Sequence, residues 1–438
     1  MKIGIIGCGF VFDVYMGTWA KHPRLEIAGV TDRNRARVEA VCRHYALRGY
    51  DSNEALLADP EVDIVANFTS IESHYEVTKA ALEAGKHVYS EKPLTSDLNR
   101  ARELMALAES KGLHLSCAPS NALGDTSQTM WKAVEDGAIG SVRLVYAEFD
   151  DNPIYLMSPE GWRSPSGAPW PYLHEFEMGC TWEHVGYHLS WMCAMFGPVE
   201  SVTAFSKQVL PDKTDKPLNP PDTPDFSVAC LNFKSGVVGR ITCSIAAPQD
   251  HRMRIIGNRG ELSADTYRHY QCPVRLEPFT KLSMHARKSI TVRHSPFLQW
   301  LTGSGGRRIP LVRNVPPGAE RIIDTGGSRW SPKAWIGRIK RREFGQQDKC
   351  LGLAELADAI TTGRQPFPSH DFTLHLTELT LAIQGAGTNS KTHLLETSFE
   401  PIALPQATRD NAPNYLEATR PRFLDRIVEQ MVARKHKG

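Results

Sequence analysis

The 438-residue sequence lacks the features that would place it in a membrane, a secretory or a zinc-binding class. Its nine cysteines stand singly without a CxxC pair, so neither a disulfide framework nor a thiolate zinc site is indicated. No run approaches the roughly twenty apolar residues of a membrane span. The amino terminus has one lysine followed by a strand pattern, without an apolar signal segment. We therefore expect a cytoplasmic protein with no transmembrane segment.

The chain also has little excess charge, with a formal net charge of +2. Hydrophobic residues make up 41% of the sequence and charged residues 23%, which is ordinary for a folded globular protein and argues against disorder. The length is sufficient for two or three hydrophobic cores.

Strand and helix patterns alternate through the first 120 residues. The strand patterns cover 3–6, 25–30, 63–68, 87–90 and 114–117, and the helical patterns between them cover 33–45, 74–84 and 98–111. Gly85 and Gly112 stand where glycines end helices. This alternation predicts an α/β fold, with a doubly wound parallel Rossmann sheet that binds ligands at the carboxyl ends of its strands.

A glycine turn follows the first strand pattern. Gly7 and Gly9 form a GxG pair, and Asp32 ends the second strand, as in a dinucleotide-binding fingerprint. The full GxGxxG motif would have a small residue at position 12, where this chain has Phe12. The alternative is an ordinary strand-turn-helix whose glycines serve only the turn. The polar residues that follow favour the dinucleotide site.

The sequence Glu91-Lys92-Pro93 follows the strand pattern 87–90. Together with the GxG opening, Asp32 and His74, it resembles the glucose-fructose oxidoreductase / inositol dehydrogenase / MocA (Gfo/Idh/MocA) family. The resemblance implies an NAD(P)-dependent oxidoreductase acting on a hydroxyl of a sugar, a sugar derivative or a nucleotide sugar. Lys92 would contact the reacting hydroxyl, and we expect partial desolvation beside another cation to lower its pKa. The alternative is a surface lysine that caps the next helix.

The resemblance also implies a set of cofactor contacts. These are Gly7, Gly9, Phe10, Val11, Asp32, Arg33, Thr69, His74, Glu91, Lys92 and Asn121. The carboxylate of Asp32 would accept both ribose hydroxyls and repel a 2′-phosphate, which favours NAD. Arg33 leaves NADP as the alternative.

The second family signature falls on residues 178–188. Gly186 and His188 fit it, while His184 stands where the family has an aspartate and Glu183 supplies an acid one position earlier. Residues four apart share a helical face, so His184 and His188 are expected to converge on one substrate. We predict His188 as acid/base and His184 as a hydrogen-bonding or relay partner. For His184, a structural helix residue is the alternative.

Two histidines at this spacing also suit zinc. The hydrolytic HExxH motif needs its glutamate directly after the first histidine, whereas Glu183 precedes it here. A third ligand would have to come from His174, Glu175 or Glu177, and we expect no metal.

The segment 152–177 is rich in proline and aromatic residues and leads into the predicted catalytic helix. We predict a substrate lid, because aromatic faces suit sugar rings while arginine and carboxylates bind hydroxyls. The predicted substrate contacts are Trp162, Arg163, Tyr172, Glu175 and Glu183, with Trp170 and Glu177 nearby. These side chains could equally pack the segment against the domain.

Residues 121–438 are expected to form a second α/β domain. Consecutive strand patterns without helices between them indicate a largely antiparallel sheet, whose open face would form a homodimer or homotetramer. Residues 281–345 depart from the family pattern as a basic insertion, with 14 Lys/Arg against 3 Asp/Glu. It would bind an anionic partner such as a nucleotide-sugar diphosphate, an acidic polysaccharide or a membrane surface. A solvated loop or an arm gripping a neighbouring subunit is the alternative, and no nucleic-acid motif accompanies the charge.

Two other functions remain open at this point. One is a redox-assisted lyase, epimerase or glycosidase that recycles bound NAD. The other is a non-catalytic NAD-binding scaffold that uses the basic insertion.

Overall fold

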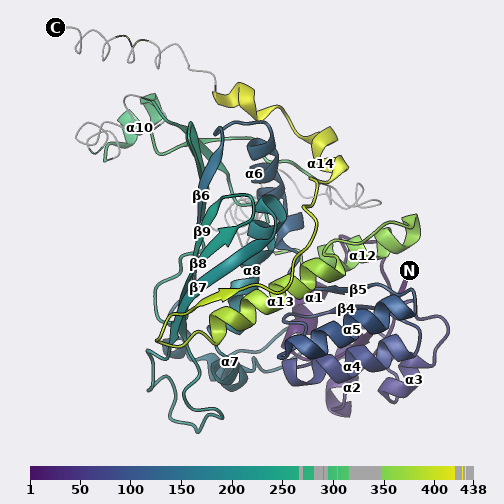
Figure 1. The fold of residues 1–438 in the computed structure, drawn as a ribbon. Coiled ribbons are helices and arrows are strands. Elements are labelled where there is room, and N and C mark those ends of the chain that lie inside the picture. Colours follow the sequence, from purple (N-terminus) through teal and green to yellow (C-terminus); the bar gives the residue numbers. More distant parts are fainter. Residues whose placement is uncertain are drawn as a thin grey trace, which may run out of the picture.

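The computed structural model describes residues 1–265, 270–280, 294–302, 304–314 and 347–419, and the single residues 290, 427 and 430. Two sheets organise this part of the chain (Figure 1). The first has the strand order β2-β1-β3-β4-β5 and is parallel throughout. Its strands are β1 (Lys2–Ile6), β2 (Glu26–Thr31), β3 (Ile64–Asn67), β4 (His87–Ser90) and β5 (Leu115–Cys117). The predicted Rossmann sheet is confirmed.

Helices cover both faces of this sheet, which is why its strands are almost continuously apolar. They are α1 (Phe10–Trp19), α2 (Arg35–Tyr45), α3 (Asn53–Leu57), α4 (Ile71–Glu83) and α5 (Leu98–Ser110). Residues of α1 and α2 pack with Ile3 and Ile5 on one face. Residues of α3, α4 and α5 pack with Val65 and Val88 on the other.

The second sheet has the order β13-β12-β11-β10-β6-β9-β8-β7-β14. Among the strand pairs that the structure describes in this sheet, only β6–β9 is parallel, so the expectation of a largely antiparallel sheet is confirmed. The strands are β6 (Val142–Asp150), β7 (Val199–Lys207), β8 (Phe226–Phe233), β9 (Val238–Ser244), β10 (Met253–Gly257), β11 (Gly260–Ala264), β12 (Arg275–Pro278), β13 (Arg307–Arg308) and β14 (Thr392–Leu394).

One face of the second sheet is covered by two long helices, α8 (Cys180–Phe196) and α13 (His370–Gln384). Residues of β8 alternate between buried and more exposed positions, as expected of a sheet with one covered face. The remaining helices are α6 (Asp125–Glu135), α7 (Tyr172–Met178), α10 (Pro296–Thr302), α12 (Leu351–Thr362), α14 (Gln406–Asn411) and the short 3₁₀ turns η1 (Asn121–Leu123), η2 (Ile154–Leu156), η3 (Pro159–Gly161) and η4 (Tyr415–Thr419). None of the described helices is both long and apolar enough to cross a bilayer.

Helix α12 does not follow a simple division of the chain at residue 120. It returns to the first domain, where Leu353 and Leu356 join the core of the parallel sheet. Within the predicted basic insertion, β13 pairs with β12, and Val312 is fully buried. Residues 307–314 therefore belong to the second domain. Most of the rest of the insertion lies outside the described residues.

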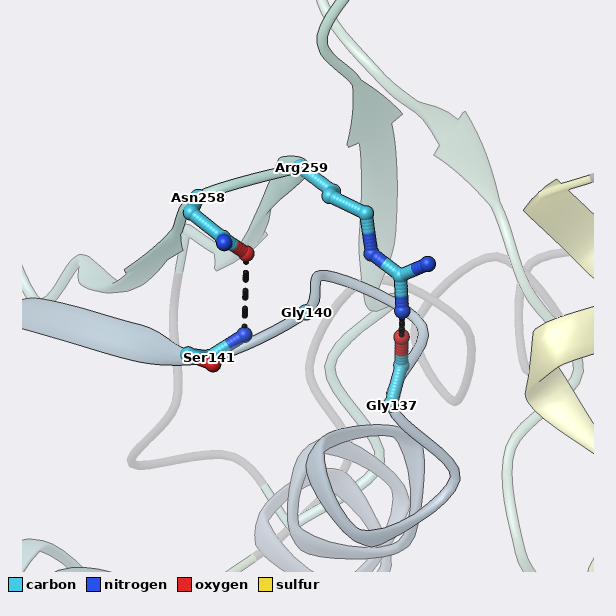
Figure 2. A pocket seen from close by; sticks show the side chains of 5 residues that line it. All are labelled: Gly137, Gly140, Ser141, Asn258 and Arg259. Atoms are coloured by element: carbon cyan, nitrogen blue, oxygen red, sulfur yellow. Dashed lines mark hydrogen bonds between the residues drawn. The ribbon is translucent and has the colours of Figure 1, made fainter.

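Two turns interlock beside the amino-terminal end of β6 (Figure 2). The guanidinium of Arg259 donates to the carbonyl of Gly137 at 3.0 Å, and the Asn258 side chain accepts from the amide of Ser141 at 2.9 Å. Gly140 has a φ of +72°, and a Cβ there would lie 2.0 Å from the Asn258 side-chain oxygen. These contacts tie the turn after α6 to the β10–β11 hairpin and indicate a structural joint.

Candidate functional site

A cavity of about 1140 Å³ lies at the carboxyl ends of the parallel strands and is walled by α8 and by residues 151–171, here called the lid loop. Most of the residues predicted from the sequence line it. These are Gly7, Gly9, Phe10, Val11, Asp32, Arg33, Thr69, His74, Glu91, Lys92, Trp162, Glu175, Glu183 and His184. The two domains thus contribute to one shared cavity.

The glycine turn shapes the dinucleotide end of the cavity. Gly7 has a φ of +106°, and a Cβ there would lie 2.5 Å from the main chain of Phe68. Gly9 precedes α1, and a Cβ there would meet nothing within 4 Å. The first amides of α1 are therefore accessible to an anionic diphosphate. Phe12, which replaces the small residue of GxGxxG, is fully buried and packs on Tyr45. The core therefore accommodates its larger side chain.

Asp32 is fixed at the end of β2. One of its carboxylate oxygens accepts the amide hydrogen of Cys8 and the other that of Asn34, each at 2.7 Å. Arg33 lines the cavity beside it. A glycine cradle with a fixed carboxylate at the next strand end suits the diphosphate and ribose of a nicotinamide dinucleotide.

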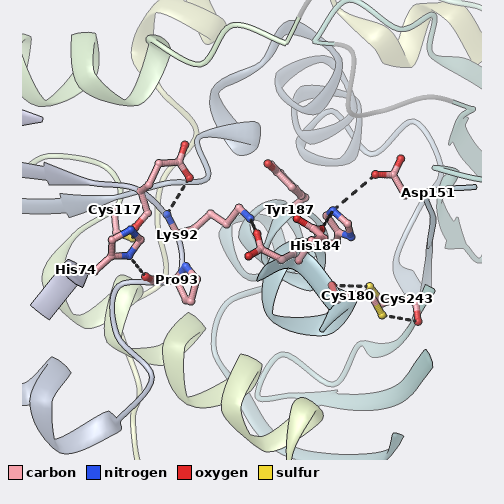
Figure 3. A network of polar contacts seen from close by, with 12 residues as sticks. His74, Lys92, Pro93, Cys117, Asp151, Cys180, His184, Tyr187 and Cys243 are labelled. Atoms are coloured by element: carbon pink, nitrogen blue, oxygen red, sulfur yellow. Dashed lines mark hydrogen bonds and ion pairs between the residues drawn. The ribbon is translucent and has the colours of Figure 1, made fainter. Parts of the chain in front are cut away.

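Lys92 lies where the two domains meet (Figure 3). Its amine is 2.5 Å from the Glu183 carboxylate on α8 and 5.5 Å from the centre of the Tyr187 ring. Burial alone would lower the pKa of Lys92, but Glu183 and the neighbouring acidic groups outweigh it and raise this pKa above its ordinary value. The expectation of a lowered pKa is wrong in this arrangement, because the nearest partner of Lys92 is a carboxylate.

Glu91 lies behind Lys92 and is buried. It accepts hydrogen bonds from the Tyr15 hydroxyl at 2.9 Å and the Lys349 amine at 3.2 Å. Burial would raise the pKa of Glu91, but the charges of Lys349 and Lys92 lower it to about 2. Glu91 is therefore an anion at neutral pH, and its carboxylate accepts from the Lys349 amine and from the main-chain amide of Lys92.

His74 connects two loops at the strand ends. Its ring nitrogens lie 2.7 Å from the Pro93 carbonyl and 3.1 Å from the Thr69 carbonyl. Burial lowers the pKa of His74. The side chain lines the cavity, but these contacts position the turn that carries Lys92. Direct contact of His74 with a cofactor stays a prediction.

The two histidines of α8 have different surroundings. His184 lines the cavity, with its Nε2 atom 3.2 Å from Glu175 and 3.6 Å from Asp151. Its ring stacks on Phe149 at a centroid distance of 4.8 Å. His184 thus has the position expected of a group that reaches a substrate.

His188 is fully buried and is not among the residues that line the cavity. Its Nδ1 atom accepts from the Trp191 indole at 2.9 Å, so Nε2 carries the hydrogen and donates to the Glu148 carbonyl at 2.7 Å. Burial lowers the pKa of His188 to about 3. This geometry contradicts the predicted acid/base role, because both ring nitrogens are used inside the core.

Three further predicted residues do not line the cavity. Asn121 is buried behind it and accepts from Tyr270 at 3.3 Å. The Arg163 guanidinium donates to the carbonyls of Glu160 and Trp162, which keeps it within its own loop. Tyr172 lies on α7 beside Lys216, whose amine is 5.9 Å from the ring centre. Their predicted ligand contacts are not supported by this geometry.

The lid loop is fastened to the first domain by a set of contacts here called the serine clasp. Ser164 and Ser166 donate from their hydroxyls to the buried Asp13 carboxylate at 2.5 and 2.6 Å. Arg37 on α2 donates to the Ser166 hydroxyl at 2.7 Å, and Tyr45 donates to Asp13 at 2.5 Å. The following lid residues, Ala168 to Pro171, line the cavity. The clasp therefore holds part of the second domain over the dinucleotide end.

Sequence reasoning missed Asp151, Tyr187 and Lys349, which all line the cavity. Tyr187 lies within residues 178–188, but the family pattern in this segment indicated its neighbours His184 and His188. Lys349 is 258 residues from Glu91, and no local pattern indicated its position. Within the described residues, no group of three or more His, Cys, Asp or Glu side chains has the arrangement of a metal site.

Comparison with known families agrees with this architecture. Residues 1–118 match the oxidoreductase family with an NAD-binding Rossmann fold, and residues 127–263 match the GFO/IDH/MocA C-terminal domain. The chain is 39% identical to the uncharacterized oxidoreductase YhhX of Escherichia coli over 119 residues, which are 27% of this chain and 34% of that protein. It is 25% identical to the uncharacterized oxidoreductase sll0816 of Synechocystis over 74% of this chain and 86% of that protein.

Solved structures share the fold at low identity. The UDP-N-acetylglucosamine 3-dehydrogenase GnnA of Acidithiobacillus ferrooxidans has a TM-score of 0.60 at 18% identity, covering 88% of this chain and 97% of its own. The WlbA dehydrogenase of Bordetella pertussis, solved with NADH and UDP-GlcNAcA, has a TM-score of 0.61 at 18% identity, covering 90% and 97%. With both domains matched and the cavity built at their junction, the chain is an NAD(P)-binding oxidoreductase of the Gfo/Idh/MocA family.

Proposed function

We propose that this oxidoreductase transfers a hydride between a nicotinamide dinucleotide and a hydroxyl carbon of a sugar, a sugar derivative or a nucleotide sugar. The observation that carries the proposal is the position of the Lys92 amine, which faces Glu183 and Tyr187 in the cavity that also contains the glycine turn. Sugar nucleotides in the names of GnnA and WlbA support this substrate class.

A bound nicotinamide dinucleotide supplies the hydride acceptor. The amides at the start of α1 would hold its diphosphate, and Asp32 would accept its ribose hydroxyls. Because the Asp32 carboxylate would repel the 2′-phosphate of NADP, we propose NAD as the preferred cofactor.

The side chains around Lys92 suit a polyhydroxylated substrate. A substrate hydroxyl would replace Glu183 as the hydrogen-bond partner of the Lys92 amine, which then polarises that hydroxyl. His184, backed by Glu175 and Asp151, would bind a second hydroxyl. The rings of Trp162 and Trp170, 4.8 Å apart, offer apolar surface to the sugar ring.

Reduction of NAD and NADP during incubation with sugars and UDP- or GDP-sugars tests the proposal. Lys92→Ala should lower kcat by about 100-fold or more while leaving the Kd of NAD within about threefold. Lys391→Ala is the matched control, because Lys391 is exposed and is not among the cavity-lining residues. Absence of nicotinamide turnover with the whole panel, or full activity of Lys92→Ala, would overturn the proposal.

The serine clasp favours a second candidate, a redox-neutral lyase, epimerase or glycosidase that keeps its dinucleotide through the reaction. A lid fastened over the dinucleotide end slows exchange of the cofactor, which such a reaction does not need. Nucleotide that copurifies with the protein, together with product formation and no net NADH, would distinguish this candidate from the dehydrogenase.

For assembly we propose a homo-oligomer formed through the less covered face of the nine-stranded sheet. Leu144 and Tyr146 on β6 are only partly buried on that face. Light scattering of the wild type and of Leu144→Asp tests this, and an unchanged mass of the variant argues against that face. A cytoplasmic location stays a prediction of the sequence.

A further inference from the structure

Lys349 enters the cavity from a part of the chain that no motif pointed to. Its amine donates to the Tyr187 hydroxyl oxygen at 3.1 Å and to a Glu91 carboxylate oxygen at 3.2 Å. The Lys349 side chain is only 8% exposed, yet it lines the cavity. Among the described residues these are its two hydrogen-bond acceptors, whereas an ammonium group carries three hydrogens. One donor of Lys349 is therefore available to a ligand.

The position of this amine is fixed from both sides. The preceding residue, Asp348, lies 3.0 Å from the ring of His22, which follows α1. On the other side, Glu91 is itself held by a hydrogen bond from the Tyr15 hydroxyl at 2.9 Å. A donor that is already fixed loses little conformational entropy when a ligand binds. The Lys349 amine is thus preorganised to donate.

The remaining donor of Lys349 lies close to the expected reaction centre. Lys92 is 5.5 Å from the centre of the Tyr187 ring, and Lys349 is 5.4 Å from the same ring centre. Lys92 is the group proposed to bind the reacting hydroxyl. The two ammonium groups therefore border one region of the cavity, in which a sugar presents hydroxyls on neighbouring carbons.

The charges around Lys349 favour a neutral oxygen over an anion as its ligand. Glu91 is buried and ionised, and it contacts the Lys349 amine directly. This carboxylate balances the charge of Lys349, and it would repel a substrate carboxylate or phosphate that approached the same amine. A hydroxyl oxygen accepts an N–H hydrogen without adding charge.

We infer that Lys349 is a specificity-determining residue, whose amine donates to a substrate hydroxyl on a carbon next to the one that is oxidised. The inference rests on the proposed function. It gives the cavity a second fixed donor beside Lys92, so a substrate needs two adjacent hydroxyls to use both donors. A site built to hydrogen-bond a hydroxyl rejects the analogue that lacks it, because the buried donor is then left without a partner.

Monodeoxy sugars test the inference, because each removes one hydroxyl from the best substrate of the panel; for glucose these are 2-, 3-, 4- and 6-deoxyglucose. With the wild type, one analogue that lacks a hydroxyl beside the oxidised carbon should lose about 10- to 100-fold in kcat/KM. With Lys349→Met the same analogue should lose less than about threefold. A purely structural role of Lys349 would weaken every sugar equally. Equal losses in the two proteins, or a wild type that accepts every analogue within about threefold, would overturn the inference.

Further variants secure this comparison. Lys349→Met leaves Glu91 buried without one partner, so the double variant Lys349→Met, Glu91→Gln is measured as well and should show the same loss of discrimination. Lys391→Met is the matched control, because Lys391 is exposed and is not among the cavity-lining residues. The Kd of NAD should stay within about threefold in Lys349→Met. A Kd raised more than about tenfold, with all sugars affected alike, would indicate a contact with the dinucleotide and contradict the inference.

A binding measurement distinguishes failure of the inference from failure of the proposed function. Calorimetric titration of the same sugars into the NADH complex detects binding where no hydride can leave the sugar. If only the wild type discriminates against the deoxy analogue while no sugar reduces NAD, the proposed hydride transfer is wrong and the inference stands. If sugars reduce NAD but both proteins discriminate alike, the inference is wrong. If no sugar of the panel binds, the substrate class and the inference both fail.

Discussion

The two ends of the cavity are built in different ways. At the dinucleotide end, main-chain geometry dominates: Gly7 needs its positive φ, and the amides after Gly9 lie open at the start of α1. At the substrate end, side chains from distant segments converge, with Lys92, Glu183 and Lys349 coming from three separate parts of the chain. The first kind of site is fixed by local sequence, whereas the second depends on how the domains pack.

The two histidines of α8 test this comparison, because one faces the cavity and the other lies in the core. The largest expected effect is the loss of stability on replacing the core histidine, His188. His188→Ala should lower the free energy of unfolding by about 3 kcal/mol, because it leaves a cavity and removes partners from the Trp191 indole and the Glu148 carbonyl. Urea denaturation measures this effect. The folded fraction should keep its kcat within about threefold. A large loss of kcat at unchanged stability would instead support a catalytic role for His188.

Acid should destabilise the substrate end through Glu91. The folded-state pKa of about 2 lies below the ordinary value of 4.5, so Glu91 adds stability above about pH 4.5 that is lost as the pH falls toward 2. The full contribution is about 3 kcal/mol. Glu91→Gln should flatten the fall in unfolding free energy between pH 5 and 2, measured by urea denaturation at each pH. An equally steep fall in the variant would show that other carboxylates are responsible.

His184→Ala should affect activity more than stability. We expect kcat to fall by about 100-fold, because the residue faces the cavity with Glu175 and Asp151 behind it. Steady-state kinetics and thermal melting, run in parallel with His188→Ala, should give opposite patterns in the two variants. A pair of variants with the same pattern would remove the distinction between the two positions.

The smallest expected effect concerns the serine clasp. Ser166→Ala removes hydrogen bonds to Asp13 and Arg37, each contributing about 1 kcal/mol. Release of bound NADH, followed by fluorescence after addition of excess NAD, should become about five- to tenfold faster. Ser158→Ala is a control in the same loop, because Ser158 is exposed and is not among the cavity-lining residues. Equal release rates in all three proteins would mean that the clasp does not retain the cofactor.

The fold and the dinucleotide end of the cavity could be predicted from the sequence, because short-range patterns determine them. The alternation of apolar strands and amphipathic helices predicted the parallel sheet, and Gly85 and Gly112 end their helices with positive φ as expected. The position of Lys92 followed from the turn after β4.

The substrate end could be predicted only in part. Helical spacing placed His184 and His188 on one face. It could not show that the indole of Trp191, one turn later, would donate a hydrogen bond to the Nδ1 atom of His188. The contact of Lys349 with Glu91 could not be predicted for a different reason. It spans 258 residues and depends on the return of α12 to the first domain. Side-chain partners of this kind are decided by tertiary packing.

The anchoring of Ser164 and Ser166 on Asp13 has a consequence for the autonomy of the parallel-sheet domain. A fragment ending near residue 120 would keep the glycine turn and Asp32, yet it would lose the roof formed by Ala168 to Pro171. Such a fragment should bind dinucleotides only loosely. Slow release of a bound dinucleotide would then require both domains, and exchanging one domain between relatives would alter the release rate even where every fingerprint residue is retained.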